Sequence, residues 1–324
     1  MRNRLLRKAA ICAGLALAAL QFGSNADAQG AKKVRIGDVA PIAAAWPQFV
    51  AVDKGLLRRA GIEPEVTYVG NVANTVQQLA AGSFEMALST FDTAVRAIES
   101  GADAVIVAAT AIKYPYSIMS AASVKTAADM KGKRIVLPFP KDFLTILWNR
   151  WLREQGVNPA DVEQIYDGAT PNRFAALSAN RAQAAALGGP FDFRAADQGF
   201  YKLLDLGAFG KEFGFLVILA RPRWLQESPD TARAYLRALS EATDFLYDPA
   251  NREEAIDILA RNTKQDRQIA TRTYDYFIKE AQVFSRKLQV PEVIVENTVK
   301  TLIEIGDLKP GPRRKLTDVG YLPR

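Results

Sequence analysis

From Val34 onward, short apolar runs alternate with segments of helical periodicity, and this alternation constrains the fold more than any other feature of the sequence. It is typical of an α/β fold with largely parallel strands. Phe213 to Ala220 is one further apolar run, and after Arg221 the pattern is almost wholly helical. We expect strands in two groups, the first near 34–39, 63–69, 84–89, 104–111 and 116–121, and the second near 134–137, 162–166, 182–187 and 201–205.

Glycine and proline indicate where helices begin and end. Pro47 suits the first turn of a helix, where its missing N–H is not needed. Several glycines suit the left-handed position that follows a helix. These are Gly61, Gly82, Gly101 and Gly156.

Two short patterns occur twice in the chain. Residues 57–64 and 152–159 share the pattern L-R-x-x-G-[I/V]-x-P, and residues 79–87 are matched by 177–185. In the second pair Gly82 and Asn180 occupy the same position, and both residue types tolerate a positive φ. Two explanations stay open: all helix-to-strand corners share this chemistry, or two similar α/β lobes lie side by side.

The composition excludes several classes of enzyme. The chain contains no histidine and one cysteine, Cys12. A Ser-His-Asp triad, a Cys-His dyad and a histidine zinc site therefore cannot be built from it. Its basic residues are dispersed among acidic ones, so the net charge of +7 implies neither a nucleic acid partner nor binding to an anionic membrane.

The first 28 residues have the pattern of a cleavable secretory signal peptide. A basic start around Arg2 and Lys8 precedes an apolar stretch from Ala9 to Leu20, and residues 26–28 read Ala-Asp-Ala. The apolar stretch is shorter than the roughly 20 residues that span a bilayer. We therefore expect cleavage after Ala28 and export to the periplasm.

Five stretches in this order resemble the solute-binding proteins of nitrate, sulfonate and taurine-type ABC transporters, a branch of the type II periplasmic binding proteins. The stretches are V-R-I-G at 34–37, F-V-A-V-D-K-G-L-L at 49–57, L-A-A-G-S-F-E-M-A at 79–87, D-M-K-G-K-R-I at 129–135 and G-V-N-P-A-D-V at 156–162. Glu85 stands where the family usually has aspartate, and Gln183 replaces the corresponding acid in the second half.

The resemblance implies a two-lobe fold with two crossover strands and a helical C-terminal segment. Lobe I would comprise residues 32–115 and 217–324, and lobe II residues 116–216. It also implies a binding protein rather than an enzyme, without a cofactor. Such a protein captures a small molecule between its lobes, closes and delivers it to an ABC permease. Monomers are usual in the family.

Ligands of open α/β sheets bind beyond the carboxyl ends of the strands, so the strand-exit loops are the candidate site. The helix N-termini that follow such loops favour an anionic group. The loops are 43–46, 70–74 and 89–92 in the first half, and 139–143, 170–173 and 189–192 in the second. The candidate ligand-binding residues are Trp46, Asn71, Ser89, Thr90, Lys141, Phe143, Arg173, Phe191 and Asp192.

Each candidate residue has two possible roles, contact with the ligand or a purely structural one. Ser89, Thr90 and Asn71 donate to ligand oxygens or cap helices. Lys141 and Arg173 pair with a carboxylate or sulfonate, or are solvated. The aromatic candidates contact the body of the ligand or belong to the core. Asp192 accepts a ligand amine or caps a helix. We expect a small organic anion or zwitterion as ligand.

Other functions compete with this one, and each has its own requirement. Pyrimidine synthases of thiamine biosynthesis share the architecture but need a histidine and a cysteine-rich motif, and a binder of pyrimidine precursors would need neither. A carboxylate pair among Asp92, Asp142 and Asp192 would suit a glycosidase, although their sequence context gives no sign of a raised pKa. A ligand sensor for a membrane kinase would have the same lobes as a transport receptor.

Overall fold

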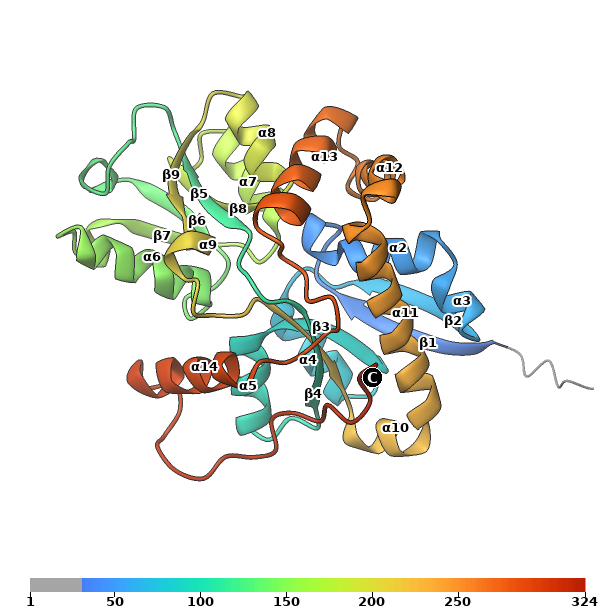
Figure 1. Cartoon of the computed structure of the whole chain (residues 1–324). Coiled ribbons are helices and arrows are strands. Elements are labelled where there is room, and N and C mark those ends of the chain that lie inside the picture. Colours follow the sequence, from blue (N-terminus) through green and yellow to red (C-terminus); the bar gives the residue numbers. More distant parts are fainter. Residues whose placement is uncertain (1–30, 324) are drawn as a thin grey trace, which may run out of the picture. The chain divides into compact units, whose positions relative to one another are not determined.

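The structure is a computed structural model and describes residues 31–323. The expected signal peptide at residues 1–28 lies outside the described residues. From Lys33 onward the chain forms one compact unit, which holds two five-stranded sheets (Figure 1). Within the part of the chain that is described, helices are too short or too polar to cross a membrane.

The first sheet, sheet A, takes four strands from residues 32–111 and a fifth from residues 216–220. Its strand order is β2-β1-β3-β10-β4. Strand β1 is parallel to β3, whereas β10 is antiparallel to both β3 and β4. The strands are β1 (Lys32–Asp38), β2 (Ile62–Tyr68), β3 (Met86–Thr90), β4 (Val105–Ala111) and β10 (Leu216–Ala220).

The second sheet, sheet B, is built from the middle of the chain. Its order is β7-β6-β8-β5-β9, with β6 parallel to β7 and β8 and with β5 antiparallel to β8 and β9. The strands are β5 (Tyr116–Ser120), β6 (Arg134–Leu137), β7 (Glu163–Tyr166), β8 (Ala184–Gly188) and β9 (Tyr201–Asp205). The chain crosses from one sheet to the other before β5 and before β10, so the two crossing strands are the antiparallel ones.

The two sheets repeat one topology, because each β strand of sheet A has a counterpart at the same place in sheet B. The residue that follows the matched helix has a positive φ in both halves, 83° at Gly82 and 55° at Asn180. Both observations favour two similar halves as the explanation of the sequence repeat. All ten expected strands are present, and Gly61, Gly101 and Gly156 have the expected positive φ.

Helices follow most strands, and those after β10 form a C-terminal group. Pro47 lies in the first turn of α2, as the sequence indicates, and α11 begins at Pro229. Helix α11 packs against α2 and α3, and α14 packs against α5. The helices are α2 (Trp46–Asp53), α3 (Leu56–Arg59), α4 (Val72–Ala80), α5 (Phe91–Glu99), α6 (Phe143–Glu154), α7 (Thr170–Ser178), α8 (Phe191–Asp197), α9 (Leu206–Phe209), α10 (Pro222–Glu227), α11 (Pro229–Tyr247), α12 (Arg252–Thr263), α13 (Arg267–Tyr274) and α14 (Glu292–Glu304), with short 3₁₀ segments such as Ala43–Ala45 between them.

Every residue of β4 and β10 is buried, so sheet A has an apolar centre covered on both faces. The C-terminal segment also pairs with the outer strand, through bridges from Phe284 to Ala111 and from Thr317 to Ile106. This pairing protects the edge of β4 from association with other chains.

Candidate ligand-binding site

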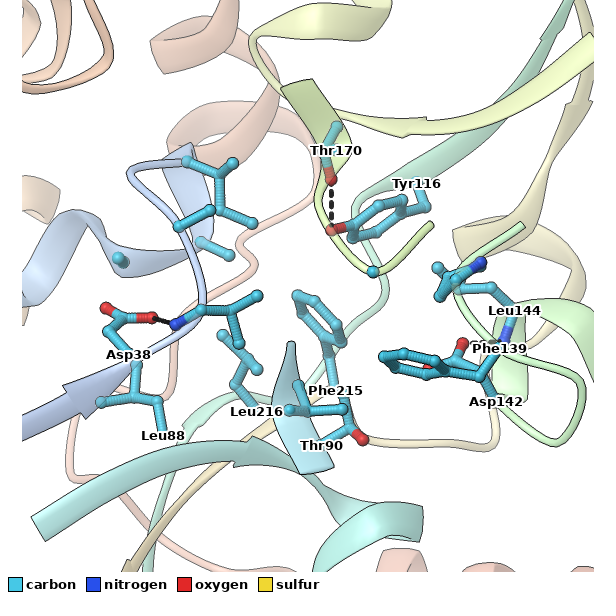
Figure 2. Close-up of a pocket in the computed structure, with 18 of the residues that line it drawn as sticks. Asp38, Leu88, Thr90, Tyr116, Phe139, Asp142, Leu144, Thr170, Phe215 and Leu216 are labelled. Atoms are coloured by element: carbon cyan, nitrogen blue, oxygen red, sulfur yellow. Dashed lines mark hydrogen bonds between the residues drawn. The ribbon is translucent and has the colours of Figure 1, made fainter. Parts of the chain in front are cut away.

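A pocket lies where loops of sheet A and sheet B meet (Figure 2). Its volume is about 50 Å³, counted as the space that the centre of a water molecule can occupy. The lining is mostly apolar and includes a few polar side chains. The lining residues are Asp38, Val39, Ala40, Ile42, Ala44, Ala45, Val72, Leu88, Thr90, Tyr116, Pro138, Phe139, Asp142, Leu144, Gly168, Thr170, Arg173, Phe215 and Leu216. We call this cavity the ligand pocket.

Four helices begin at the ligand pocket. Val72 and Thr170 are the first residues of α4 and α7, Thr90 precedes α5, and Leu144 is in the first turn of α6. Two of these helices come from each half of the structure. Because the N-terminal end of a helix carries a partial positive charge, the pocket favours a negatively charged group.

Arg173 is the one positively charged residue that lines the pocket, and it is 1% exposed. Its guanidinium donates to the backbone oxygens of Ala186 at 2.7 Å, Asp167 at 2.8 Å and Gly168 at 2.9 Å, and to Oγ1 of Thr170 at 2.9 Å. It forms no ion pair with a carboxylate of the described residues. Its hydrogen bonds therefore all go to neutral acceptors. Burial lowers the pKa of the guanidinium, and the charges of Asp142 and Asp167 offset part of this effect.

Thr170 links Arg173 to Tyr116 through two hydrogen bonds. Its Oγ1 accepts from Arg173 and lies 3.2 Å from the hydroxyl of Tyr116, so Thr170 can donate to the phenol oxygen (Figure 2). The 3.2 Å contact fits a proton on either oxygen, and when Thr170 is the donor the Tyr116 O–H is left to donate to a ligand in the pocket. We call Arg173, Thr170 and Tyr116 the hydroxyl relay. Hydrogen bonds that are polarised by a charge are the stronger ones, so the relay presents a strong donor.

Tyr116 is positioned by close packing in the crossing strand β5. Its ring lies 5.3 Å from that of Phe215, centroid to centroid. On the other side, a Cβ at Gly188 of β8 would meet the Tyr116 ring at 2.8 Å, so only glycine leaves room for it. Burial raises the pKa of Tyr116, so the phenol keeps its proton as a donor.

Two carboxyl groups also line the pocket. Asp38, at the end of β1, accepts from the N–H of Val39 at 2.6 Å, and its other oxygen has no hydrogen-bond partner among the described residues. Asp142 caps α6 by accepting from the N–H of Leu144 at 2.8 Å. Burial raises the pKa of each to about 7, and for Asp142 the nearby charge of Asp92 adds to the effect.

The loops of the two sheets touch beside the pocket. The N–H of Ala43 donates to the carbonyl of Gly189 at 3.1 Å. At Gly168, a Cβ would lie only 2.7 Å from Cβ of Asn71 and 3.1 Å from Cζ of Phe139. Gly168 therefore allows a close approach between the loop after β7 and the loop after β2.

Among the residues that the sequence singled out, Thr90 and Arg173 line the ligand pocket. Ser89 precedes Thr90 but faces the other way and is fully buried, with its hydroxyl 3.5 Å from the carbonyl of Val72. Asn71 caps α4 by accepting from the N–H of Asn74 at 2.8 Å and lies beside the pocket at its contact with Gly168.

The aromatic candidates lie in the core. Trp46 donates to the carbonyl of Ala255 at 3.1 Å and contacts Tyr274 edge to face. Phe143 packs on Phe213. Phe191 packs on Phe174 in a smaller apolar cluster beneath sheet B. None of these three aromatic residues is a lining residue of the ligand pocket.

The two remaining candidates are charged and also lie outside the lining. Lys141 is exposed at the rim and pairs with Asp307. Asp192 is buried in the first turn of α8, and burial raises its pKa to about 7.

Tyr116, Phe215 and Asp38 line the pocket but were not singled out from the sequence. Tyr116 and Phe215 belong to the crossing segments. Their apolar runs indicate buried strands, and such a pattern does not show which side chains contact a ligand. Asp38 was assigned to the interior of a strand that ends there. Asp142 and Thr170 lie in loops that the sequence did indicate. Groups of acidic residues that could hold a metal ion are absent from the described residues.

Comparison with known proteins identifies the family and the fold. The model of the NMT1-like family matches residues 27–260. The nitrate/nitrite binding protein NrtA of Nostoc sp. is 26% identical over 139 residues, 42% of this chain, and the chain spans only 31% of that protein's length. A putative binding protein of Brucella abortus is 25% identical over 238 residues, 72% of each chain.

Solved structures confirm the fold. The alkanesulfonate-binding protein SsuA of Xanthomonas axonopodis pv. citri, bound to MOPS, is 20% identical, and the superposition covers 84% of this chain and 92% of that chain with a TM-score of 0.70. The expected two-sheet binding-protein fold is therefore confirmed. The chain belongs to the NMT1-like family and has the fold of the solute-binding proteins of ABC transporters.

Proposed function

We propose that this protein is a periplasmic receptor that captures a small organic anion or zwitterion in the ligand pocket and delivers it to an ABC permease. The observation that carries the proposal is the hydroxyl relay. Arg173 is buried without a carboxylate partner, and its charge polarises the phenol of Tyr116 toward the pocket. An anionic ligand group would supply the missing negative charge.

The surroundings of the relay support an anionic group over a neutral one. The four helix N-termini at the pocket add their dipoles to the charge of Arg173. The hydroxyl of Thr90 lies at one of these helix starts. The names of the nitrate/nitrite and alkanesulfonate relatives are consistent with an anion.

Capture would involve closure of two lobes, residues 32–115 with 217–324 and residues 116–216. Thr90 belongs to sheet A and the relay to sheet B, so one ligand contacts both. Contacts that only the closed form makes would stabilise it when ligand is bound. The closed monomer would then dock on the permease in the inner membrane, and the signal peptide would export the receptor to the periplasm.

A thermal-shift screen of small anions tests this function. A ligand present at 100 times its Kd should stabilise the protein by about 2.7 kcal/mol. For the best ligand found, Tyr116→Phe should weaken binding by about 1.5 to 3 kcal/mol, since a hydrogen bond to a charged group is lost.

The matched control is Tyr274→Phe, which removes a hydroxyl bonded to the carbonyl of Leu246, away from the pocket. It should leave the affinity unchanged. If only hydrophobic, uncharged compounds raise the melting temperature, or if Tyr116→Phe binds the ligand as tightly as the wild type, the proposed function is wrong.

A further inference from the structure

We infer that the ligand is a small zwitterion, whose positively charged amino group is accepted by the carboxylate of Asp142 while its anionic group binds the hydroxyl relay. This inference rests on the proposed function and specifies the ligand class of the same pocket.

Asp142 is a buried carboxylate with a single hydrogen bond and no ion pair within the described part of the chain. It is 6% exposed, and one carboxylate oxygen accepts from the N–H of Leu144. For the other oxygen, the described residues provide neither a hydrogen bond nor an ion pair. A buried carboxylate with one hydrogen bond is poorly compensated, and a ligand ammonium would complete it.

The charged and titratable groups around Asp142 offset its charge only in part, because burial and Asp92 outweigh Arg173 and Arg96. Asp92 on α5 is a second acid. Arg96 on the same helix pairs with Asp92 at 2.6 Å and with Asp307 at 2.9 Å, so its charge is already matched. Arg173 faces Asp142 without pairing with it, and the neighbouring tyrosines, Tyr114 and Tyr116, are neutral.

Asp142 is better placed for this role than Asp38. In Figure 2, Asp142 lies on the same side of the pocket as Phe139, and Asp38 lies at the opposite end. Arg173 acts electrostatically on Asp142, whereas the groups that sense the charge of Asp38 are Tyr68 and Tyr235. A positive and a negative ligand group would thus face Asp142 and the relay within one small cavity.

The size of the cavity limits the ligand. The space open to the centre of a water molecule is only about 50 Å³, so the pocket suits a small ligand and not a bulky one. This corresponds to a ligand with a short chain between its two charged groups. Short amino acids and aminosulfonates have that size.

Matched pairs of compounds test the inference on the wild-type protein. Isothermal titration calorimetry would compare glycine with acetate, β-alanine with propanoate, and taurine with ethanesulfonate. In at least one pair, the compound with the amino group should bind at least ten times more tightly. Because each pair shares its anionic group, the ratio reports the amino group alone.

Asp142→Asn should remove this preference. Asparagine can still cap α6, so the variant should fold. Its affinity for the amine-bearing compound should fall to that of the amine-free one, whose binding should not weaken. Asp266→Asn is the matched control, because Asp266 caps α13 outside the pocket by accepting from the N–H of Ile269 at 2.9 Å, and it should keep the preference.

The pH dependence gives an independent readout with a defined sign. Burial and Asp92 raise the pKa of Asp142 to about 7, so its ionised fraction falls about tenfold between pH 8 and pH 6. Binding of the amine-bearing compound should therefore weaken by about tenfold over this range and release protons near pH 7. An anion that lacks an amine should bind more tightly at pH 6 and take up a proton.

Three results would overturn the inference. Equal or tighter binding of the amine-free members would contradict it and leave the proposed anion receptor intact. A preference that survives in Asp142→Asn would place the amino group elsewhere. If none of the six compounds binds, the small zwitterion is excluded, and the wider anion screen decides the proposed function separately.

Discussion

Asp307, in the segment that follows α14, accepts a hydrogen bond from Nε of Arg96 on α5 at 2.9 Å. The same carboxylate pairs with Lys141, in the loop between β6 and α6. Arg96 also donates to the backbone carbonyl of Lys141. The C-terminal segment therefore ties a helix beside sheet A to a loop of sheet B, directly next to Asp142.

We expect Asp307→Asn to destabilise the protein by about 1 to 3 kcal/mol, measured by urea denaturation. The Asp307 side chain is only 3% exposed, so its hydrogen bonds to two cations are poorly replaced by water. Lys315→Met removes a solvent-exposed pair with Asp318 and is the control. That change should cost less than about 1 kcal/mol. Equal effects of the two substitutions would contradict a structural role for Asp307.

The contribution of Asp307 should disappear in acid. Burial alone would raise the pKa of Asp307, but hydrogen bonds from Lys141 and Arg96 outweigh it and lower the pKa. A carboxylate with a lowered pKa stabilises the fold above its unfolded pKa of about 3.9 and loses this contribution as the pH falls through its folded value. The difference in unfolding free energy between wild type and Asp307→Asn should therefore be constant from pH 6 to 7 and shrink below about pH 4. A constant difference at all pH values would show that the charge is irrelevant.

The fold could be predicted from the sequence because its signals are local. Apolar runs of strand length, separated by helices, indicated all ten strands, and the positive φ of Gly82 and Asn180 follows from their place after a helix. The strand order inside each sheet depends on contacts between distant segments. The pattern of residues does not specify these contacts, and the family resemblance implied only the two crossover strands.

The site could be predicted only to the level of loops. The strand-exit rule indicated the segments that contribute Thr90, Asp142 and Arg173 to the pocket. It could not predict side-chain direction. Trp46 turns into the core because Ala255 and Tyr274, more than 200 residues later, provide its partners.

Gly168→Ala should weaken ligand binding more than it weakens the fold. The new Cβ would lie 2.7 Å from Cβ of Asn71 and 3.0 Å from the carbonyl oxygen of Gly70, so the loops of the two sheets would be pushed apart. Overpacking of this kind costs about 1 to 3 kcal/mol. If the contact forms only in a closed state, this cost should appear in the Kd from calorimetry rather than in the urea midpoint.

The control is Gly320→Ala, where the nearest atom to a new Cβ is Oδ1 of Asp318 at 3.6 Å. It should change neither quantity. A Gly168→Ala variant that is destabilised toward urea but binds ligand normally would mean that the loops stay together without ligand, and closure would then not be the step that the contact controls.

Thr90→Val should weaken ligand binding by about 1 kcal/mol, whereas Ser89→Ala should not, as measured by calorimetry with the best ligand of the anion screen. Successive strand residues point to opposite sides, so Thr90 faces the ligand pocket and Ser89 faces α4. The hydroxyl of Thr90 lies 2.9 Å from that of Thr93, a partner that can turn to release it for a ligand oxygen. Because valine has nearly the shape of threonine, a loss of affinity would report the hydroxyl itself. Equal affinities of the two variants and the wild type would remove Thr90 from the binding site and leave recognition of the anion to the hydroxyl relay alone.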